Sequence, residues 1–261
     1  MIVAWVMLMG LNKYKIIGLN FLVSQIIIAI FLIFAWAIWY PSPLADFSGF
    51  YKMSQIILLT NLCLGPILIF IIYKEHKKKL KQDLLVLAII QVSAFLFGAY
   101  SIYLKHPAYL VFTVDRFTLV SEKEITSDKI QYPQLKTSFF SSPKLVFAQR
   151  PENPKARNEL LFSVIFEGKP DLDRRAEYYK PFANHLTSVL ERSIETDILF
   201  PDELSQIKLS KFLGKYGGEK QDYAYLPLQG NRGQNVIWVL DRKDGHPIDI
   251  IDSDPWLVAN K

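Results

Sequence analysis

Aspartates crowd the last part of the chain, where their spacing could suit a cation. Calcium takes oxygen ligands, and carboxylates supply them. The spacing does not fit an EF-hand loop, however, and the Asp-Gly pair at 244–245 is already typical of a hairpin turn. The histidines lack the spacing of a zinc site. The sequence therefore predicts no metal and no cofactor. The residues considered are Asp241, Asp244, Asp249, Asp252, Asp254, His76, His106, His185 and His246.

Motifs for nucleophilic or phosphate chemistry are absent from the sequence. The chain has no GxSxG elbow, no HExxH pair and no GxxxxGK[ST] loop. These patterns position a nucleophile, a zinc ion or a phosphate. Serines and histidines are present, so a triad assembled by folding stays open. The sequence favours a protein that is not an enzyme.

One charged pair, Asp115 and Arg116, interrupts the apolar run from Tyr109 to Val120. Neighbours on a strand point to opposite faces, so the two cannot both face one core. The pair can be a solvent-facing charge, an ion pair that anchors the sheet at the membrane end of its domain, or a binding surface that includes Phe117. The structural interpretations are favoured, and Asp115, Arg116 and Phe117 remain candidates for partner contact.

These residues must be positioned by elements of two kinds, and the first kind crosses a membrane. No charged residue occurs in three runs, Ile16 to Ala45, Met53 to Tyr73 and Leu84 to Leu104. A helix of about 21 residues spans about 31 Å, and the hydrocarbon core of a bilayer is about 30 Å thick. We therefore expect three transmembrane helices, at about 16–40, 53–73 and 84–104. Buried helices of a soluble core are the alternative.

A cleavable signal peptide is a further alternative for the first run. Its apolar stretch is longer than the usual core of a signal peptide, which has roughly 7–15 residues. Trp36 and Trp39 near its end also suit the aromatic belt of a membrane interface. We therefore prefer a retained helix.

The lysines predict the orientation of these helices. Lys13 and Lys15 precede the first helix, and five lysines lie in the loop from Lys74 to Asp83. Positively charged loops stay in the cytoplasm. The sequence thus predicts a multi-pass protein of a bacterial inner membrane, with a cytoplasmic N-terminus, a transmembrane region at 1–104 and a periplasmic domain at 105–261.

The net charge of +5 comes from the transmembrane region alone. Residues 1–104 hold eight Lys/Arg and three Asp/Glu, whereas the remaining residues hold 22 of each sign. A nucleic-acid-binding domain would carry its basic residues on the soluble part. No nucleic-acid partner is therefore expected, whereas the lysine-rich loop suits membrane lipids.

A few polar or helix-breaking residues lie within the predicted bilayer. Asn61 and Gln91 can form hydrogen bonds between helices of this chain, or they can contact a helix of another protein. Gly65 and Pro66 are expected to interrupt the second helix, because proline lacks an N–H. Ala94 and Gly98, four residues apart, would allow close approach of two backbones. Asn61, Gly65, Pro66 and Gln91 complete the set of candidate contact residues.

Beyond residue 105 the pattern predicts a single α+β domain with a mainly antiparallel sheet. A helical period covers about 180–194, and a second helix is expected between Pro201 and Gly217. Turns are expected at 231–233 and 244–245. The predicted strands are Tyr109–Val120, Leu160–Phe166, Tyr223–Leu228, Asn235–Asp241 and Pro247–Ile251.

Several motifs in a fixed order make the chain resemble the TfpX/TfpZ family of type IV pilin accessory proteins. The most distinctive is HPAYLVFTVDRFTLV, which begins at His106. The others include WYP from Trp39, LGPILIFIIYK from Leu64, RNELLFSVIF from Arg157, YLPLQG from Tyr225 and DPW from Asp254. The resemblance implies a non-enzymatic, chaperone-like helper for a cognate major pilin, which supports pilin stability and pilus assembly at the inner membrane. The family offers no catalytic residues to carry over.

This resemblance implies the major type IV pilin as partner, with membrane lipids and other pilus assembly components around it. The transmembrane helices would lie beside the apolar helix of the pilin, and the exported sheet would contact the pilin head. Two alternatives stay open. The first is a membrane-anchored periplasmic ligand-binding or sensor protein, although the chain has little cytoplasmic sequence for an output domain. The second is an enzyme of the cell envelope.

Overall fold

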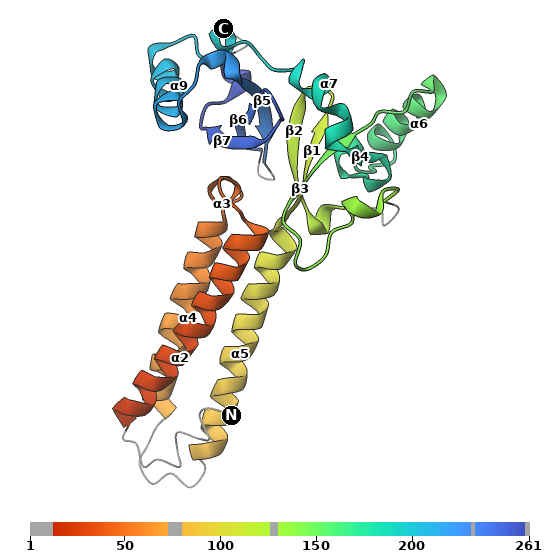
Figure 1. Cartoon of the computed structure of the whole chain (residues 1–261). Helices are drawn as coiled ribbons and strands as arrows, with labels where there is room; N and C mark the ends of the chain where they lie inside the picture. Colours follow the sequence, from red (N-terminus) through yellow and green to blue (C-terminus); the bar gives the residue numbers. More distant parts are fainter. Residues whose placement is uncertain (1–12, 73–79, 126–129, 231–232, 259–261) are drawn as a thin grey trace. The chain divides into compact units, whose positions relative to one another are not determined.

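A computed structural model describes residues 13–72, 80–125, 130–230 and 233–258. The chain divides into two compact units, which are treated separately (Figure 1). The helical unit contains residues up to Ile38 and residues Gly49–Leu104. The α+β unit contains Trp39–Ser48 and everything from Lys105. The sequence had predicted one division after residue 104, whereas the structure also assigns the short segment 39–48 to the second unit.

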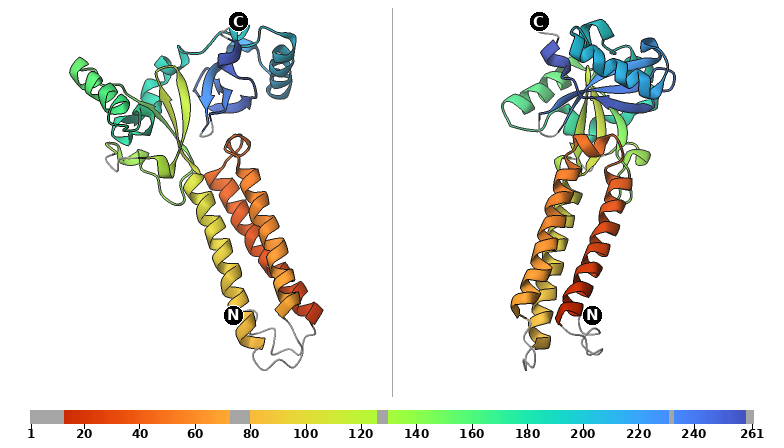
Figure 2. Two further views of the ribbon diagram at one scale, coloured as in Figure 1. Left: turned by 180° about the vertical axis from the view of Figure 1, so that it is seen from behind. Right: turned by 90° about the vertical axis from the view of Figure 1, so that its left-hand side faces the viewer.

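The described part of the helical unit contains three long helices, α2 (Lys13–Phe34), α4 (Phe50–Ile72) and α5 (Leu80–Lys105). Figure 2 shows them running side by side. A π-helical turn, η1 (Ala35–Trp39), extends α2. Among the described residues, Gly18–Trp39 and Leu85–Lys105 are long and apolar enough to cross a membrane. The second predicted segment is helical as well, but that it crosses a membrane stays a prediction.

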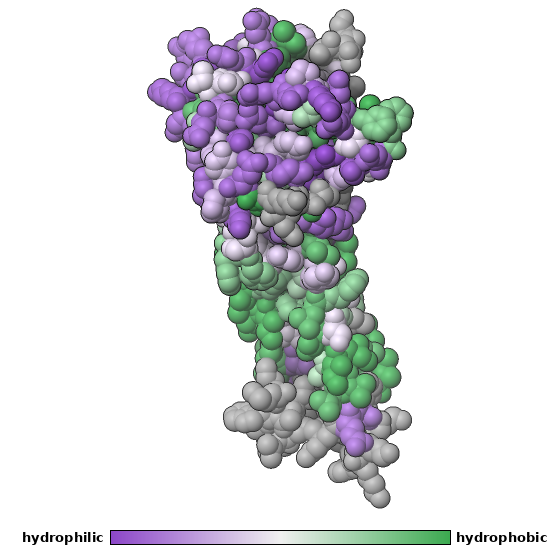
Figure 3. Space-filling model, turned by 90° about the vertical axis from the view of Figure 1, so that its right-hand side faces the viewer, coloured by the Kyte–Doolittle hydropathy of each residue, from purple (hydrophilic) through white to green (hydrophobic). Residues whose placement is uncertain are grey.

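Close packing joins the three helices. A Cβ atom on Gly98 of α5 would lie 2.9 Å from Cγ1 of Ile57 in α4, so Gly98 leaves room for the Ile57 side chain, and the expected close approach of two backbones stays a prediction. Phe31 of α2 and Phe95 of α5 meet edge to face, with ring centroids 5.5 Å apart. Many large apolar side chains of the unit are exposed. Figure 3 shows this surface as green, which is what a lipid-facing helix requires.

The α+β unit is built on one mixed sheet of seven strands in the order β4-β3-β1-β2-β5-β6-β7. The pairs β1–β3 and β2–β5 are parallel, and the other four are antiparallel. The predicted α+β class is confirmed, and the parallel pairs were not expected. The strands are β1 (Pro107–Thr113), β2 (Arg116–Ser121), β3 (Lys144–Ala148), β4 (Tyr179–Pro181), β5 (Tyr223–Gln229), β6 (Asn235–Asp241) and β7 (Pro247–Ile251).

Both faces of this sheet are covered. On one face, alternate residues such as Phe112, Phe117 and Trp238 form a core with α7 (Leu186–Leu190) and α3 (Leu44–Phe47). On the other face lie two smaller cores, one under α6 (Pro154–Ile165) and one under α8 (Thr196–Leu199) and α9 (Glu203–Tyr216). In Figure 1, α6 flanks the half of the sheet with β1–β4, and α9 flanks β5–β7. A short helix, α10 (Pro255–Val258), ends the described chain.

The predictions for the C-terminal part are largely confirmed. The last two predicted strands have the bounds of β6 and β7, and α9 ends at Gly217, whose φ is +76°. Asp244 and Gly245 lie in the turn before β7. The predicted turn at 231–233 lies partly outside the described residues.

Four predictions about local structure were wrong. The segment 160–166 is helical and belongs to α6, which starts where the Asn153 side chain accepts a hydrogen bond from the Lys155 N–H and Pro154 occupies the first turn. Residues 109–120 form two strands and a hairpin instead of one strand. The helix expected at 180–194 is reduced to a 3₁₀ turn and α7, with β4 before them. Pro66 lies inside α4 and does not interrupt it.

Residues 39–48 are built into the α+β unit. The indole N–H of Trp39 donates to the carbonyl of Phe139 at 2.7 Å, and Leu44 is part of the main core. Phe47 packs closely on Gly230, where a Cβ would lie 2.7 Å from its ring. The connection between α2 and α4 therefore contributes to the core of a unit that otherwise begins at Lys105.

Candidate functional site

Two of the candidate residues within the helical unit, Asn61 and Gln91, form hydrogen bonds within this chain. Asn61 is 8% exposed, and its amide donates to the carbonyl of Ile57, one turn earlier, at 3.0 Å. Gln91 of α5 and Asn20 of α2 exchange two amide hydrogen bonds of 3.4 Å. Gly65 and Pro66 lie on α4. For Asn61 and Gln91 the structure thus favours bonding within this chain, the alternative that needs no partner helix.

Phe117 is a core residue. Its side chain is fully buried, and its ring meets that of Phe112 edge to face at a centroid distance of 5.1 Å. The ring centroid of Phe182 lies 6.0 Å from that of Phe117. This placement favours a packing role over contact with a partner.

Asp115 and Arg116 lie at the tip of the β1–β2 hairpin, because Thr113 pairs with Arg116 and leaves a two-residue turn. Contrary to the prediction from the sequence, the two residues are therefore not neighbours on one continuous strand. The carboxylate of Asp115 accepts from Arg116 Nε at 2.9 Å, and both side chains are roughly two-fifths exposed, 44% and 38%. The Arg116 guanidinium also lies 4.7 Å from the centre of the Trp256 ring, a cation–π contact with α10.

The turn is strained at Val114, whose φ is +52°. Positive φ at the first turn residue is usual for a type II′ hairpin, but glycine normally occupies that position. A β-branched residue there is an outlier. Val114 is half exposed, at 50%. Strain of this kind collects at functional sites, so the hairpin tip is a candidate surface.

A depression of about 240 Å³ lies beside this tip, and we call it the tip pocket. Phe112, Phe147 and Leu172 form its apolar part. Val114, Arg150, Ser188 and Arg192 are its exposed residues. The residues that line the pocket are distant in sequence. Most of them lie on β1, in the hairpin turn, at the end of β3 and in the region of α7, and tertiary packing brings them together. Sequence reasoning missed Arg150, Ser188 and Arg192, because no local pattern links residues so far apart.

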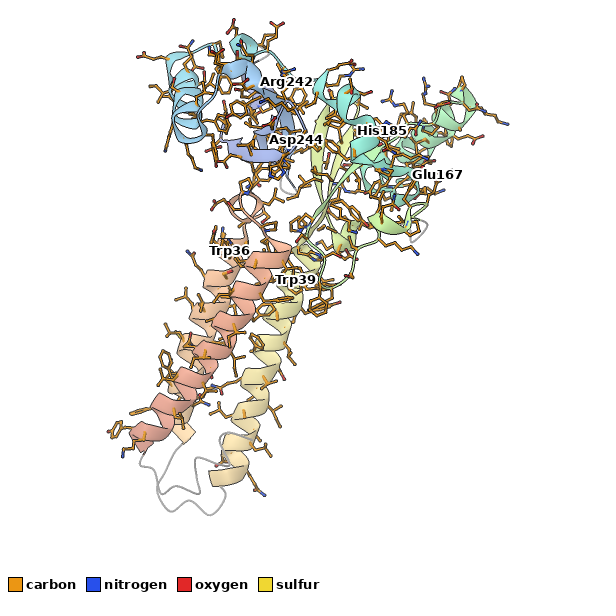
Figure 4. The ribbon with its side chains drawn as sticks, viewed as in Figure 1. Trp36, Trp39, Glu167, His185, Arg242 and Asp244 are labelled. Atoms are coloured by element: carbon orange, nitrogen blue, oxygen red, sulfur yellow. The ribbon has the colours of Figure 1, made fainter. Side chains whose placement is uncertain are left out.

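The C-terminal aspartates stabilise turns. Asp244 Oδ1 accepts from the His246 N–H at 2.8 Å, and Asp254 Oδ1 accepts from the Trp256 N–H at 2.9 Å. Asp244 and Arg242 both lie in the β6–β7 connection (Figure 4). Within the described residues, no group of three or more His, Cys, Asp or Glu could hold a metal ion.

Asp249 differs from these turn residues because it joins β7 to α9. It accepts from Tyr216 Oη at 2.6 Å and from Lys215 Nζ at 2.9 Å. Partial burial acts to raise the pKa of Asp249, but the hydrogen bonds from Tyr216, Lys215 and the Ile250 N–H outweigh it, so the pKa is lowered. The arrangement is that of a structural ion pair.

Comparison with known proteins gives three relatives, all from Dichelobacter nodosus. The fimbrial assembly proteins of serogroups I and E1 are each 27% identical over 237 residues, which cover 87% of this chain and 90% of each relative. The fimbrial assembly protein of serogroups C1 and C2 is 34% identical over 119 residues, which cover 44% of this chain and 90% of that protein. No model of a protein family matches the chain. No solved structure matches it either.

Proposed function

This chain belongs to the fimbrial assembly protein family, and on that premise we propose that it assists the assembly of type IV pili as a non-enzymatic accessory protein. The observation that carries the proposal is the extent of the similarity. Two relatives match 87% of the chain, so the similarity necessarily includes parts of both units. A shared architecture of this extent supports a shared role in fimbrial assembly.

The finer part of the proposal concerns the partner. The resemblance to the TfpX/TfpZ accessory proteins supplies a cognate major pilin, which this protein would keep stable and available, with membrane lipids and other assembly components nearby. A pilin before assembly has an apolar helix in the membrane and a globular head outside it. In this proposal the helical unit of the accessory protein would contact the apolar helix of the pilin, and its α+β unit would contact the globular head.

The proposed location is the bacterial inner membrane. Two helices are long and apolar enough to cross, and α4 supplies a third crossing in the proposal. The lysine-rich loop before α5 and the lysines at the start of α2 would then be cytoplasmic, and the α+β unit would be periplasmic. Side chains of the exposed hairpin tip, rather than the buried Phe117, would reach the pilin head.

Deletion of the gene tests this function. We would measure total pilin by immunoblot and surface pili by shearing, in the parent, the deletion strain and a complemented strain. We expect surface pili to fall and complementation to restore them. A fall in total pilin would indicate protection before assembly, whereas accumulated pilin would indicate a role in assembly itself. If both quantities equal those of the parent, the proposal fails, and the ligand-binding or sensor function becomes the leading one.

A further inference from the structure

We propose that the tip pocket binds a carboxylate-bearing segment of the pilin head, with an apolar side chain next to the carboxylate. The carboxylate is that of an aspartate, a glutamate or a chain terminus. This inference rests on the proposed function, because it names the surface through which the accessory protein would hold its partner.

The hydrogen bonding of the arginines in the α+β unit points to an anion site at the tip pocket. The described part of the α+β unit has seven, and five of them hold a polar partner within it: Arg116, Arg157, Arg174, Arg175 and Arg242. The side chains of Arg150 and Arg192 form no hydrogen bond or ion pair with any residue that the structure describes, although the Arg192 backbone N–H donates to the carbonyl of Val189, and both arginines line the tip pocket. No acidic residue lines it. Two unpaired guanidinium groups at one depression present a site for an anion.

The chemistry of arginine favours a carboxylate. A guanidinium is planar and presents its N–H groups in a fork that matches both oxygens of a carboxylate. Ser188 adds a hydroxyl at the same rim, which can donate to a carboxylate oxygen.

The apolar part of the pocket calls for a second feature in the ligand. The ring of Phe147, which lines the pocket and is partly exposed, stacks on that of Phe112 at 6.0 Å and on that of His185 at 4.2 Å, so it forms a fixed apolar shelf. His185 lies directly before α7 (Figure 4). A small inorganic anion would leave this shelf uncovered, whereas an apolar side chain beside the carboxylate would cover it.

The direction of the strands places the tip pocket at the end of β1 that lies away from Lys105. β1 starts at Pro107, directly after α5, and ends at the hairpin turn. β3 runs parallel to β1, so the carboxyl ends of both strands lie at the same end of the sheet. Arg150, which follows the end of β3, therefore lies near the hairpin turn. A strand of seven residues is about 23 Å long. The tip pocket thus lies a strand length from the point where α5 enters the α+β unit.

Site-specific cross-linking in piliated cells tests the inference. A photoreactive amino acid replaces Ser188 in the full-length protein, and pilin in the cross-linked product is detected by immunoblot. We expect pilin capture at 188 and little capture from position 211, an exposed lysine on α9. The reversal Arg150→Glu with Arg192→Glu should lower capture at 188 by about tenfold, because it repels a carboxylate. A matched reversal, Lys211→Glu with Lys220→Glu, should leave it unchanged.

The cross-linked pilin peptide, identified by mass spectrometry, should contain an acidic residue or the chain terminus. Absence of pilin capture at 188, or equal capture in both reversal variants, overturns the proposal that the tip pocket binds pilin. A reversal variant present at parental abundance that restores full piliation to the deletion strain also overturns it, while the accessory function stands. If deletion itself leaves piliation unchanged, both proposals fail.

Discussion

Val114 holds a backbone conformation that β-branched side chains rarely adopt, and this strain can be measured. Replacing it with glycine removes the clash at φ +52°. We expect Val114→Gly to raise the free energy of unfolding by about 1 kcal/mol, seen as a higher midpoint in thermal unfolding of the detergent-solubilised protein. Val114→Ala, which keeps a Cβ, should gain less.

Ile198 offers a matched control for this substitution. It is 49% exposed, close to the 50% of Val114, and it is not among the residues with positive φ. Ile198→Gly in α8 should therefore lower the midpoint, because glycine there only adds freedom to the unfolded chain. A lowered midpoint in both variants would show that Val114 is not strained.

Asp249 gives the α+β unit a pH dependence of known sign. Its pKa is lowered in the folded protein, since the bonds from Tyr216, Lys215 and the Ile250 N–H outweigh burial. A carboxyl group of this kind contributes stability above its unfolded pKa of about 3.9 and loses it as the pH falls through the folded pKa. We expect Asp249→Asn to be less stable than the parent at pH 7 in urea unfolding. Below about pH 4 the difference should shrink. A stability difference that does not change with pH would mean that the substitution acts through the shape of the side chain and not through its charge.

Gly98 of α5 leaves room for the Ile57 side chain of α4. A larger side chain there would meet Ile57, whose Cγ1 lies 2.9 Å from the position of a Cβ. We expect Gly98→Leu to destabilise the helical unit by about 1–3 kcal/mol, as overpacking does. Ile57→Ala in the same chain should restore part of the loss, because it vacates the space. Thermal unfolding in detergent measures both effects.

The control for this prediction is Gly18 of α2, which has nothing within 4 Å of its Cβ position. Gly18→Leu should change the stability by no more than a typical surface substitution does, about 0.5 kcal/mol in either direction. If Gly18→Leu and Gly98→Leu are equally destabilising, the cost belongs to the substitution itself and not to the contact with Ile57.

Elements were predictable from the sequence where their pattern is local. The long apolar runs gave α2, α4 and α5, and the alternating segments near the C-terminus gave β5, β6 and β7. The C-terminal half of α6 was predicted as a strand because its exposed side chains are apolar, so no polar face marks a helical period there. Leu161, Phe162, Ile165 and Phe166 are all exposed. β3 was missed because its position is determined by pairing with β1 and β4, which are distant in sequence.

The candidate site was predictable only in part for the same reason. Asp115 and Arg116 stood out as charges in an apolar run, and they do lie at an exposed tip. Arg150 and Arg192 carry no local signal, because only the parallel pairing of β1 with β3 and the packing of α7 bring them to one depression.

The topology of the whole molecule can be tested with reporter fusions. Alkaline phosphatase is active outside the cytoplasm, whereas green fluorescent protein exported by the general secretory route does not fluoresce. We expect phosphatase activity from fusions after residues 48 and 110 and fluorescence from a fusion after residue 79. If α4 does not cross, residues 48 and 79 will report the same side. Replacing the lysines between 74 and 81 with glutamine should weaken this orientation.

The place of residues 39–48 in the α+β core has a consequence for how the protein is made. Leu44 and Phe47 leave the ribosome long before the strands on which they pack. In the proposed topology they are carried across the membrane by the first helical hairpin and wait there until the C-terminal part has been exported. A chain whose hairpin was inserted the wrong way round has these two side chains on the wrong side of the membrane. In that topology the core of its α+β unit would lack these two side chains and would leave apolar surface exposed. Only a chain whose first hairpin was inserted in the proposed orientation would then complete the fold of the α+β unit.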